Sequence, residues 1–328
     1  MSEIGLNRVC AVLVIVVGWT GARVSAESEQ AFKTPKIEGE YVAVYRPAGD
    51  RFAGPDTTEL KAGQWYADWV PNDHAILKGP DGRWHAFGIT HPLTSTDRVH
   101  EGEFQSFHAV APIGSLKEVL RDGVWKDFPK VLPPSERPGE ILPNHAPSIV
   151  EKDGLYHMIY GPSPIRLATS PDLMKWTPKG VLFHERSGAR DPSVMLWEGT
   201  YYMVFCTEDR VGIRTSKDLV DWSESRALLR MKAGVAPESP SMVRFEGSFY
   251  LFVCGWNGIW DRKMVEGAYQ HQTYVYRSDD PLSFDGAREV ARVESHAPEV
   301  FQGEDGTWYI SSVEWPQRGV SIARLRWQ

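Results

Sequence analysis

The chain has 328 residues, of which 42% are hydrophobic, and a formal net charge of −7. This length is ample for one large core, and the mild acidity with no run of like charges speaks against nucleic-acid binding. The aromatic residues (13 Trp, 12 Tyr, 13 Phe) together with 29 Gly and 23 Pro favour many short strands and turns over a helical bundle.

The first 26 residues have the pattern of a secretion signal. Arg8 precedes an apolar run at 9–19 that is too short to span a bilayer comfortably. Val24 and Ala26 then occupy the small-residue positions of a signal-peptidase site. We therefore expect cleavage after Ala26 and a secreted or periplasmic protein that no longer contacts the membrane. A membrane anchor is the alternative.

Two cysteines remain once the signal with Cys10 is removed. Cys206 and Cys254 end the same aromatic strand in successive repeats. Two thiols are too few for a disulfide scaffold or for a structural zinc site. Buried free thiols are therefore favoured over a disulfide between the two.

An aromatic hairpin is repeated five times along the chain. Each copy has a polar residue and usually a Pro, then an apolar strand, a turn ending in Gly, and an aromatic strand. Gly supplies the positive φ that such tight turns require. The five copies begin at Asn72, Asn144, Ala189, Pro237 and Ser295.

A third strand follows the hairpin in three copies and ends near a Trp that we assign to packing. From the leading Pro to this Trp the spacing is 29 residues for Pro147 to Trp176, 30 for Pro192 to Trp222 and 29 for Pro298 to Trp327. A fourth strand is expected after Trp176 and after Trp222. A β-sandwich, the competing class, would not explain such regular spacing.

Four antiparallel strands repeated five times predict an all-β, single-domain, five-bladed β-propeller. The fifth copy ends after its third strand, so we expect the strand at 41–46 to supply the fourth and to close the ring. The expected organisation is a signal peptide at 1–26, an N-terminal extension with the ring-closing strand at 27–64, and the propeller at 65–328.

The first strand of each blade lines the axis of a propeller, so the residues that lead these strands should converge at one face. Three of these five residues are carboxylates, whose burial and mutual repulsion are costly unless they serve a function. Crowded carboxylates hold their pKa values apart, as the acid and base of glycoside hydrolysis require. The alternative for any one of them is a strand cap. The five residues are Asp73, His145, Asp191, Glu238 and His296.

These carboxylates resemble the active site of glycoside hydrolase family 43, whose members are five-bladed propellers. That family has a general-base Asp in blade one, a modulating Asp before Pro in blade three, and a general-acid Glu in a Glu-x-Pro step of blade four. Asp73, Asp191 and Glu238 match these positions over about residues 65–328. The resemblance implies inversion: Asp73 would activate water, Glu238 would protonate the leaving oxygen, and Asp191 would raise the pKa of Glu238 and orient it.

Blade one departs from that pattern, because Asn72-Asp73-His74 replaces the usual Asp-Pro. The Asn-Asp pair and the step at 190–192 also resemble family 32, the retaining fructosidases, whose first Asp is the nucleophile. The longer motif of family 32 is absent, and we expect no C-terminal β-sandwich of the kind its members usually carry. The alternatives are thus a retaining β-fructosidase and a carbohydrate-binding propeller without turnover. A protein-interaction propeller would not need three axial carboxylates.

Polar and aromatic residues around the same face suit a sugar, whose CH faces stack on rings while its hydroxyl groups need partners. For the aromatic residues, packing between blades is the alternative. The expected substrate is a plant or algal polysaccharide or oligosaccharide of the arabinan, xylan or galactan type. The candidates for substrate contacts are Asn72, His91, His145, Tyr160, Arg190, Glu208, Trp256, Trp260 and Trp315.

His296 resembles the axial His that many family 43 members carry near a bound metal ion. It is therefore a candidate ligand of an axial calcium, although the chemistry itself requires no cofactor. The sequence does not indicate an oligomeric state.

Overall fold

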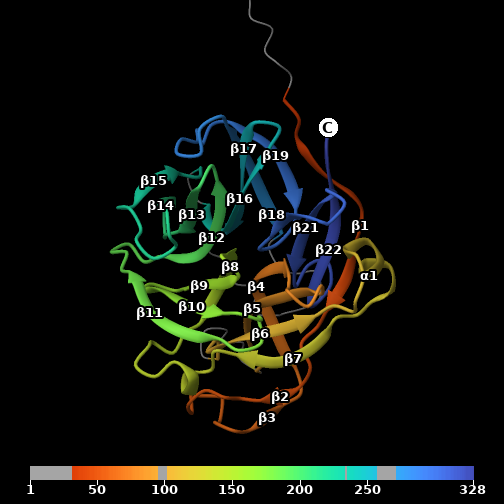
Figure 1. Cartoon of the computed structure of the whole chain (residues 1–328), viewed down its shortest axis with the longest axis vertical. Helices are drawn as coiled ribbons and strands as arrows, with labels where there is room; N and C mark the ends of the chain where they lie inside the picture. Colours follow the sequence, from red (N-terminus) through yellow and green to blue (C-terminus); the bar gives the residue numbers. More distant parts are fainter. Residues whose placement is uncertain (1–31, 95–101, 233–234, 257–270) are drawn as a thin grey trace, which may run out of the picture. The chain divides into compact units, whose positions relative to one another are not determined.

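In the computed structural model, five four-stranded antiparallel sheets follow one another around a central axis (Figure 1). The structure describes residues 32–94, 102–232, 235–256 and 271–328. The expected signal peptide and Trp260 lie outside these residues. Thr34–Gln328 form one unit, and the prediction of an all-β five-bladed propeller is confirmed.

Blades one to four each run from an inner strand to an outer strand in chain order. Blade one consists of β4 (Trp69–Lys78), β5 (Trp84–Pro92), β6 (Gln105–Val110) and β7 (Lys126–Val131). Blade two consists of β8 (His145–Lys152), β9 (Leu155–Gly161), β10 (Ile165–Ser170) and β11 (Thr177–Phe183). Blade three consists of β12 (Arg190–Trp197), β13 (Thr200–Cys206), β14 (Val211–Ser216) and β15 (Arg226–Leu229). Blade four consists of β16 (Ala236–Phe245), β17 (Ser248–Trp256), β18 (Gln272–Ser278) and β19 (Glu289–Glu294).

Blade five joins the two ends of the propeller. Its inner strands are β20 (Val300–Gln302), β21 (Trp308–Val313) and β22 (Val320–Trp327). β1 (Pro35–Tyr45) is the outer strand and runs antiparallel to β22, with Pro35 opposite Trp327 and Tyr45 opposite Val320. The N-terminal strand therefore closes the ring, as predicted, and it begins six residues before the predicted start at Tyr41.

The first hairpins of blades two, three and four turn in the same way. Each has a two-residue loop in which both residues have positive φ, as at Asp153 (53°) and Gly154 (78°). This is the turn whose twist matches that of the two flanking strands. The other two loops are Glu198-Gly199 and Glu246-Gly247.

A few short elements lie outside the blades. Helix α1 (Leu116–Asp122) connects β6 to β7, and the side chains of Ser115 and Glu118 cap its first turn. A two-stranded sheet of β2 (Asp50–Arg51) and β3 (Trp65–Tyr66) precedes blade one. A 3-10 turn, η2 (Pro134–Glu136), precedes blade two. Within the described ranges, no helix has the length and apolar character needed to cross a membrane.

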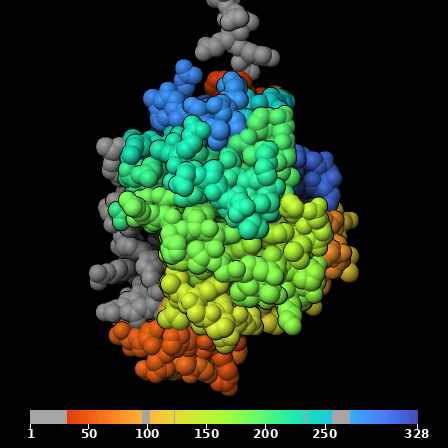
Figure 2. Space-filling view, turned by 60° about the vertical axis from the view of Figure 1, so that its left-hand side comes forward, coloured from red at the N-terminus to blue at the C-terminus, as the bar shows by residue number. Residues whose placement is uncertain are grey.

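The core consists of hydrophobic layers between neighbouring blades, because a single twisted sheet cannot bury both of its faces. Phe87 of blade one packs with Met158 of blade two, for example, and Val204 of blade three packs with Leu251 of blade four. Successive blades accordingly follow one another across the surface in Figure 2, from yellow through green to blue. Trp176, Trp222 and Trp327 belong to these layers, as predicted.

Candidate active site

The inner strands β8, β12 and β16 share one irregularity near the axis. In β12, Arg190 pairs with Cys206 and Ser193 pairs with Val204, so that Asp191 and Pro192 form a bulge. Bulges re-aim side chains and are common beside active sites. The same step lies between His145 and Ser148 in β8, and between Glu238 and Ser241 in β16.

The residue before proline has positive φ in four blades, which is uncommon for residues other than Gly. The four values are 41° for Ala146, 54° for Asp191, 45° for Ser239 and 47° for Ala297. All four residues and the prolines that follow them line a pocket on the axis. Blade one contributes Asp73 and His74 to this pocket, with His74 in place of the proline.

The five residues expected to converge therefore fall into two sets. Asp73 and Asp191 line the axial pocket, whereas in the other three blades the next residue of the chain does so. His145 and Glu238 share the register of Arg190, one residue before the bulge. A polar residue that leads a strand can line the axial pocket or lie one residue before the bulge, and the sequence pattern does not distinguish these two positions.

The structure brings the three carboxylates of the predicted catalytic set to one place. The backbone N–H of Ser239 donates to Asp191 Oδ2 at 3.2 Å, and the Ser239 hydroxyl donates to Asp73 Oδ1. Arg190 lies between Asp191 and Glu238. Its Nε is 3.4 Å from Asp191 Oδ2, and its Nη2 is 3.9 Å from Glu238 Oε1. Blades one, three and four thus each supply one carboxylate.

The charges of this cluster influence one another. Burial, followed by the negative charge of Asp191, raises the pKa of Asp73 well above its ordinary value, and Glu238 adds to the effect while the Ser239 hydroxyl opposes it. Burial works against the charge of Arg190, but the negative charges around it prevail and raise its pKa. Asp73 therefore needs a higher pH than an ordinary Asp to act as a base.

The two cysteines lie directly behind these groups. Cys206 is the cross-strand partner of Arg190, and Cys254 is the partner of Glu238. Both are buried free thiols, as predicted. Burial, followed by the charge of Asp191, raises the pKa of Cys206, and burial raises that of Cys254 to about 12. They are neutral apolar packing at the back of the site.

His145 has a carboxylate partner that the sequence pattern did not reveal. Its Nε2 lies 2.8 Å from Oε2 of the buried Glu103. The backbone N–H of Asn144 also donates to the carbonyl of Glu103 at 2.8 Å. Glu103 comes from the segment before β6 and has no motif around it, so only the fold could place it here.

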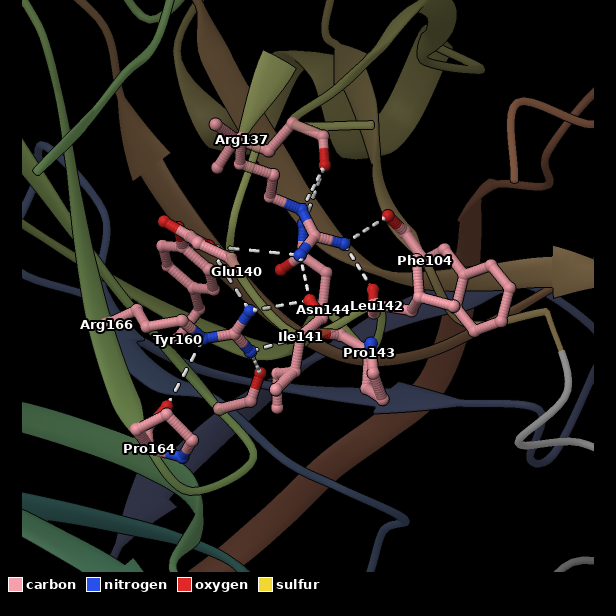
Figure 3. A network of polar contacts seen from close by, with 12 residues as sticks. Phe104, Arg137, Glu140, Ile141, Leu142, Pro143, Asn144, Tyr160, Pro164 and Arg166 are labelled. Carbon is pink, nitrogen blue, oxygen red and sulfur yellow. Dashed lines mark hydrogen bonds and ion pairs between the residues drawn. The ribbon is translucent and has the colours of Figure 1, made fainter. Parts of the chain in front are cut away.

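Tyr160 lies in a buried network between blades one and two (Figure 3). Its hydroxyl donates to Glu140 Oε2 at 2.8 Å, and the guanidinium of Arg166 lies 4.6 Å from the centre of its ring. Arg166 and Arg137 also bind backbone carbonyls, at 2.8 Å to Pro143 and 2.8 Å to Phe104. This network fixes the segment that leads into His145, and the Tyr160 hydroxyl already has a protein partner.

The other candidates for substrate contacts are spread around the axis. Asn72 lies in the β4 irregularity next to Asp73, and its Oδ1 is buried with no hydrogen-bond partner among the described residues. His91 is buried on β5, with Nδ1 2.9 Å from its neighbour's carbonyl. Glu208 is exposed in the turn after β13.

Two of the three tryptophans predicted to contact substrate are described. Trp256 is the last residue of β17, opposite Ala236, and its side chain is outside the described part. The Trp315 ring stacks on that of His271, with centroids 4.3 Å apart, and meets Tyr41 edge-on at 5.6 Å. Trp315 is thus partly packed within the protein, and its contact with substrate stays a prediction.

His296 is buried beside the axis. Its Nδ1 lies 2.9 Å from the Val313 carbonyl, and burial lowers its pKa to about 4. Calcium takes about six to eight oxygen ligands, but in the described part of the chain no three His, Cys, Asp or Glu side chains are grouped to hold a metal ion. These residues alone do not complete a calcium site, so the axial calcium stays a prediction.

Residues 186–327, which carry Asp191 and Glu238, match the family model "Glycosyl hydrolases family 43". None of the curated proteins matches the chain in sequence. By its fold and by this match over part of the chain, it is a family 43-like five-bladed β-propeller. The family match identifies the protein as a glycosidase.

Solved structures of low sequence identity share this fold. An exo-1,5-α-L-arabinanase from a bovine ruminal metagenomic library has a TM-score of 0.56 and 20% identity, over 79% of this chain and 93% of that one. An arabinanase of Bacillus subtilis has a TM-score of 0.56 and 13% identity, over 79% and 94%. A family 32 β-fructofuranosidase of Bombyx mori has a TM-score of 0.56 and 17% identity, over 78% of this chain and 60% of that longer one.

Proposed function

We propose that the protein hydrolyses plant or algal polysaccharide or oligosaccharide of the arabinan, xylan or galactan type. The observation that carries this proposal is the convergence of Asp73, Asp191 and Glu238 from three blades, joined through Ser239 and Arg190. The family match supports hydrolysis of a glycosidic bond. The structural relatives include two arabinanases and a β-xylosidase, which is consistent with arabinan or xylan within this group.

The proposed mechanism is inversion, with each carboxyl in a separate role. Glu238 is the general acid and Asp191 acts through its neighbours; in support, 30% of the Glu238 side chain is exposed and only 8% of that of Asp191. Arg190 lies against both groups and holds them in place. Asp73 is the base that activates water, and burial limits this role to pH values above its raised pKa.

We also propose that the protein is exported, with the first 26 residues removed. The support is the apolar run after Arg8 and the small residues before Glu27. N-terminal sequencing of protein recovered outside the cytoplasm should begin at Glu27. Recovery of the intact N-terminus in a membrane fraction would contradict export as a free protein.

The test of the function is hydrolysis of a substrate panel by wild type and by Glu238→Gln. The panel contains aryl α-L-arabinofuranoside, β-D-xyloside and galactosides, sucrose, and oligomers of arabinan, xylan and galactan. We expect turnover of an arabino- or xylo-substrate that Glu238→Gln lowers by about 10²–10⁴-fold. Glu224→Gln, a change to an exposed residue between β14 and β15, is the matched control and should keep full activity.

The anomer of the product that forms first, identified by NMR, decides between inversion and retention. Inversion supports the assignment of Asp73 as base, and retention contradicts it. Cleavage of sucrose alone, with retention, would favour the β-fructosidase suggested by Asn72-Asp73 and by the Bombyx mori relative. Binding of a glycan without turnover would leave a carbohydrate-binding propeller.

A further inference from the structure

Ser239 contacts two of the three carboxylates with two different groups. Its backbone N–H donates to Asp191, and its hydroxyl donates to Asp73 across the axis from β16 to β4. It also directly follows Glu238 in the chain. One residue thus connects all three members of the proposed catalytic set.

The backbone at this position does not require a hydroxyl group. Ala146 and Ala297 occupy the same place before proline in blades two and five, with φ of 41° and 47° against 45° for Ser239. All three line the axial pocket. Since alanine adopts this turn twice in the same molecule, the turn itself does not explain the serine, whereas the contact with Asp73 does.

The groups facing Asp73 are mostly unfavourable to its ionised form. Burial opposes the charge most, and Asp191 and Glu238 repel it. Asp73 also interacts electrostatically with Arg190, Cys206 and Cys254, of which the arginine is the cation. His74 and Glu299 line the same pocket as Asp73. The Ser239 hydroxyl is a short-range donor that favours the carboxylate against this background.

We propose that Ser239 is a positioning residue that favours the ionised form of Asp73 and orients it to take a proton from the attacking water, an inference that rests on the proposed function. A hydroxyl group fixed by the bulge donates to one carboxylate oxygen and leaves the other free to receive the proton of water. Its backbone N–H simultaneously fixes Asp191. The base and the modulating carboxylate are thereby aligned with Glu238 through a single turn of the backbone.

The test is kcat/KM as a function of pH for wild type, Ser239→Ala and Ser239→Thr. Ser239→Ala keeps the N–H to Asp191 and loses the bond to Asp73, so the pKa of Asp73 should rise further. We expect the acidic limb to move upward by about one pH unit, from the usual strength of a hydrogen bond to a charged group. Activity below the limb should fall roughly tenfold, with little change above it, and Ser239→Thr should restore part of the shift.

Ser241→Ala is the matched control, since Ser241 is buried two residues further along the same strand. It should leave the acidic limb where it is. An unmoved limb in Ser239→Ala, or an equal loss of activity at every pH, would overturn the inference.

A second readout does not depend on turnover. The Asp73 carboxyl is titrated by ¹³C NMR, with Asp73→Asn to assign its signal. A higher midpoint in Ser239→Ala supports the role of the hydroxyl, and an unchanged midpoint overturns it. If wild type cleaves nothing on the panel, the proposed function fails, while this titration still decides whether Ser239 controls the protonation of Asp73.

Discussion

The axial ends of blades two and five differ from those of blades three and four in side chains but not in backbone. All four have a positive-φ residue before proline, with φ between 41° and 54°. Blades two and five place Ala146 and Ala297 there, and blades three and four place Asp191 and Ser239. The turn therefore belongs to the repeated fold, and only two of these four copies carry a carboxyl or hydroxyl side chain. The proposed function rests on these exceptions to the repeat.

Blade five has a second exception next to the first. Ser148, Ser193 and Ser241 follow the bulges of blades two to four, and Glu299 takes this place after Pro298. Glu299 lines the axial pocket with Asp73, and burial raises its pKa to about 8. The proposed mechanism does not use this carboxyl.

The largest effect is expected from Asp191→Ala, which removes the difference between blade three and blades two and five at this turn. This change gives blade three the residue that blades two and five have at the same turn. The protein should fold, and kcat should fall by about 10²–10⁴-fold, because the carboxylate that we propose modulates Glu238 is gone. Steady-state kinetics and a thermal unfolding curve check both statements. A folded variant with less than about a tenfold loss would show that Asp191 is as dispensable as the alanines.

A smaller loss is expected from Arg190→Gln. Arg190 is the cation between Asp191 and Glu238, in the register where blade two has His145. Its removal should lower kcat/KM by roughly 10–100-fold, because two partly buried carboxylates lose their charged partner. The acidic limb should also move to higher pH, since negative charge near Asp73 is less compensated. Arg226→Gln, on the exposed part of β15, is the control, and a wild-type pH profile in Arg190→Gln would contradict this role.

The sequence was sufficient to predict the blades and the closure of the ring. Apolar alternation, Gly-containing turns and the regular distance to a packing Trp are local signals, and each corresponds to a contact made inside one blade or with its neighbour. The match of β1 to blade five followed from the missing fourth strand alone. The predicted catalytic residues Asp73, Asp191 and Glu238 do come together, and their roles stay predictions.

The details of the site depend on contacts that no local pattern contains. Some leading residues, such as Asp191, lie in the bulge and line the axial pocket, whereas others, such as Glu238, lie one residue before it. The two kinds look alike in sequence. The bond from Ser239 to Asp73 joins residues 166 positions apart, and that between His145 and Glu103 depends on a segment without a motif. Such pairs can be seen only when the blades are assembled.

A change in the pH dependence of stability is expected from Glu299→Gln. Burial raises the pKa of Glu299 in the folded protein to about 8, above its ordinary value of 4.5, so the folded state binds the proton more tightly than the unfolded chain. The contribution of Glu299 to the stability of wild type is therefore lost as the pH rises from about 4.5 to about 8. Glu299→Gln should match wild type near pH 4 and be the more stable protein by a few degrees in Tm at pH 8 or above. Thermal unfolding across this range checks it, and a constant difference in Tm would show that Glu299 titrates normally.

The smallest effect concerns the shared turn itself, in Ala146→Gly. A non-Gly residue at φ of 41° is strained by about 1 kcal/mol, and glycine relieves this strain at a similar entropic cost in the unfolded chain. The Tm should consequently change by less than about 2 °C. Ala168→Gly, at a buried position of β10 outside the positive-φ region, has no strain to relieve and should lower Tm by more. Equal losses in the two variants would mean that the axial turn is relaxed with alanine, and that its repeated use before proline carries no cost for the fold.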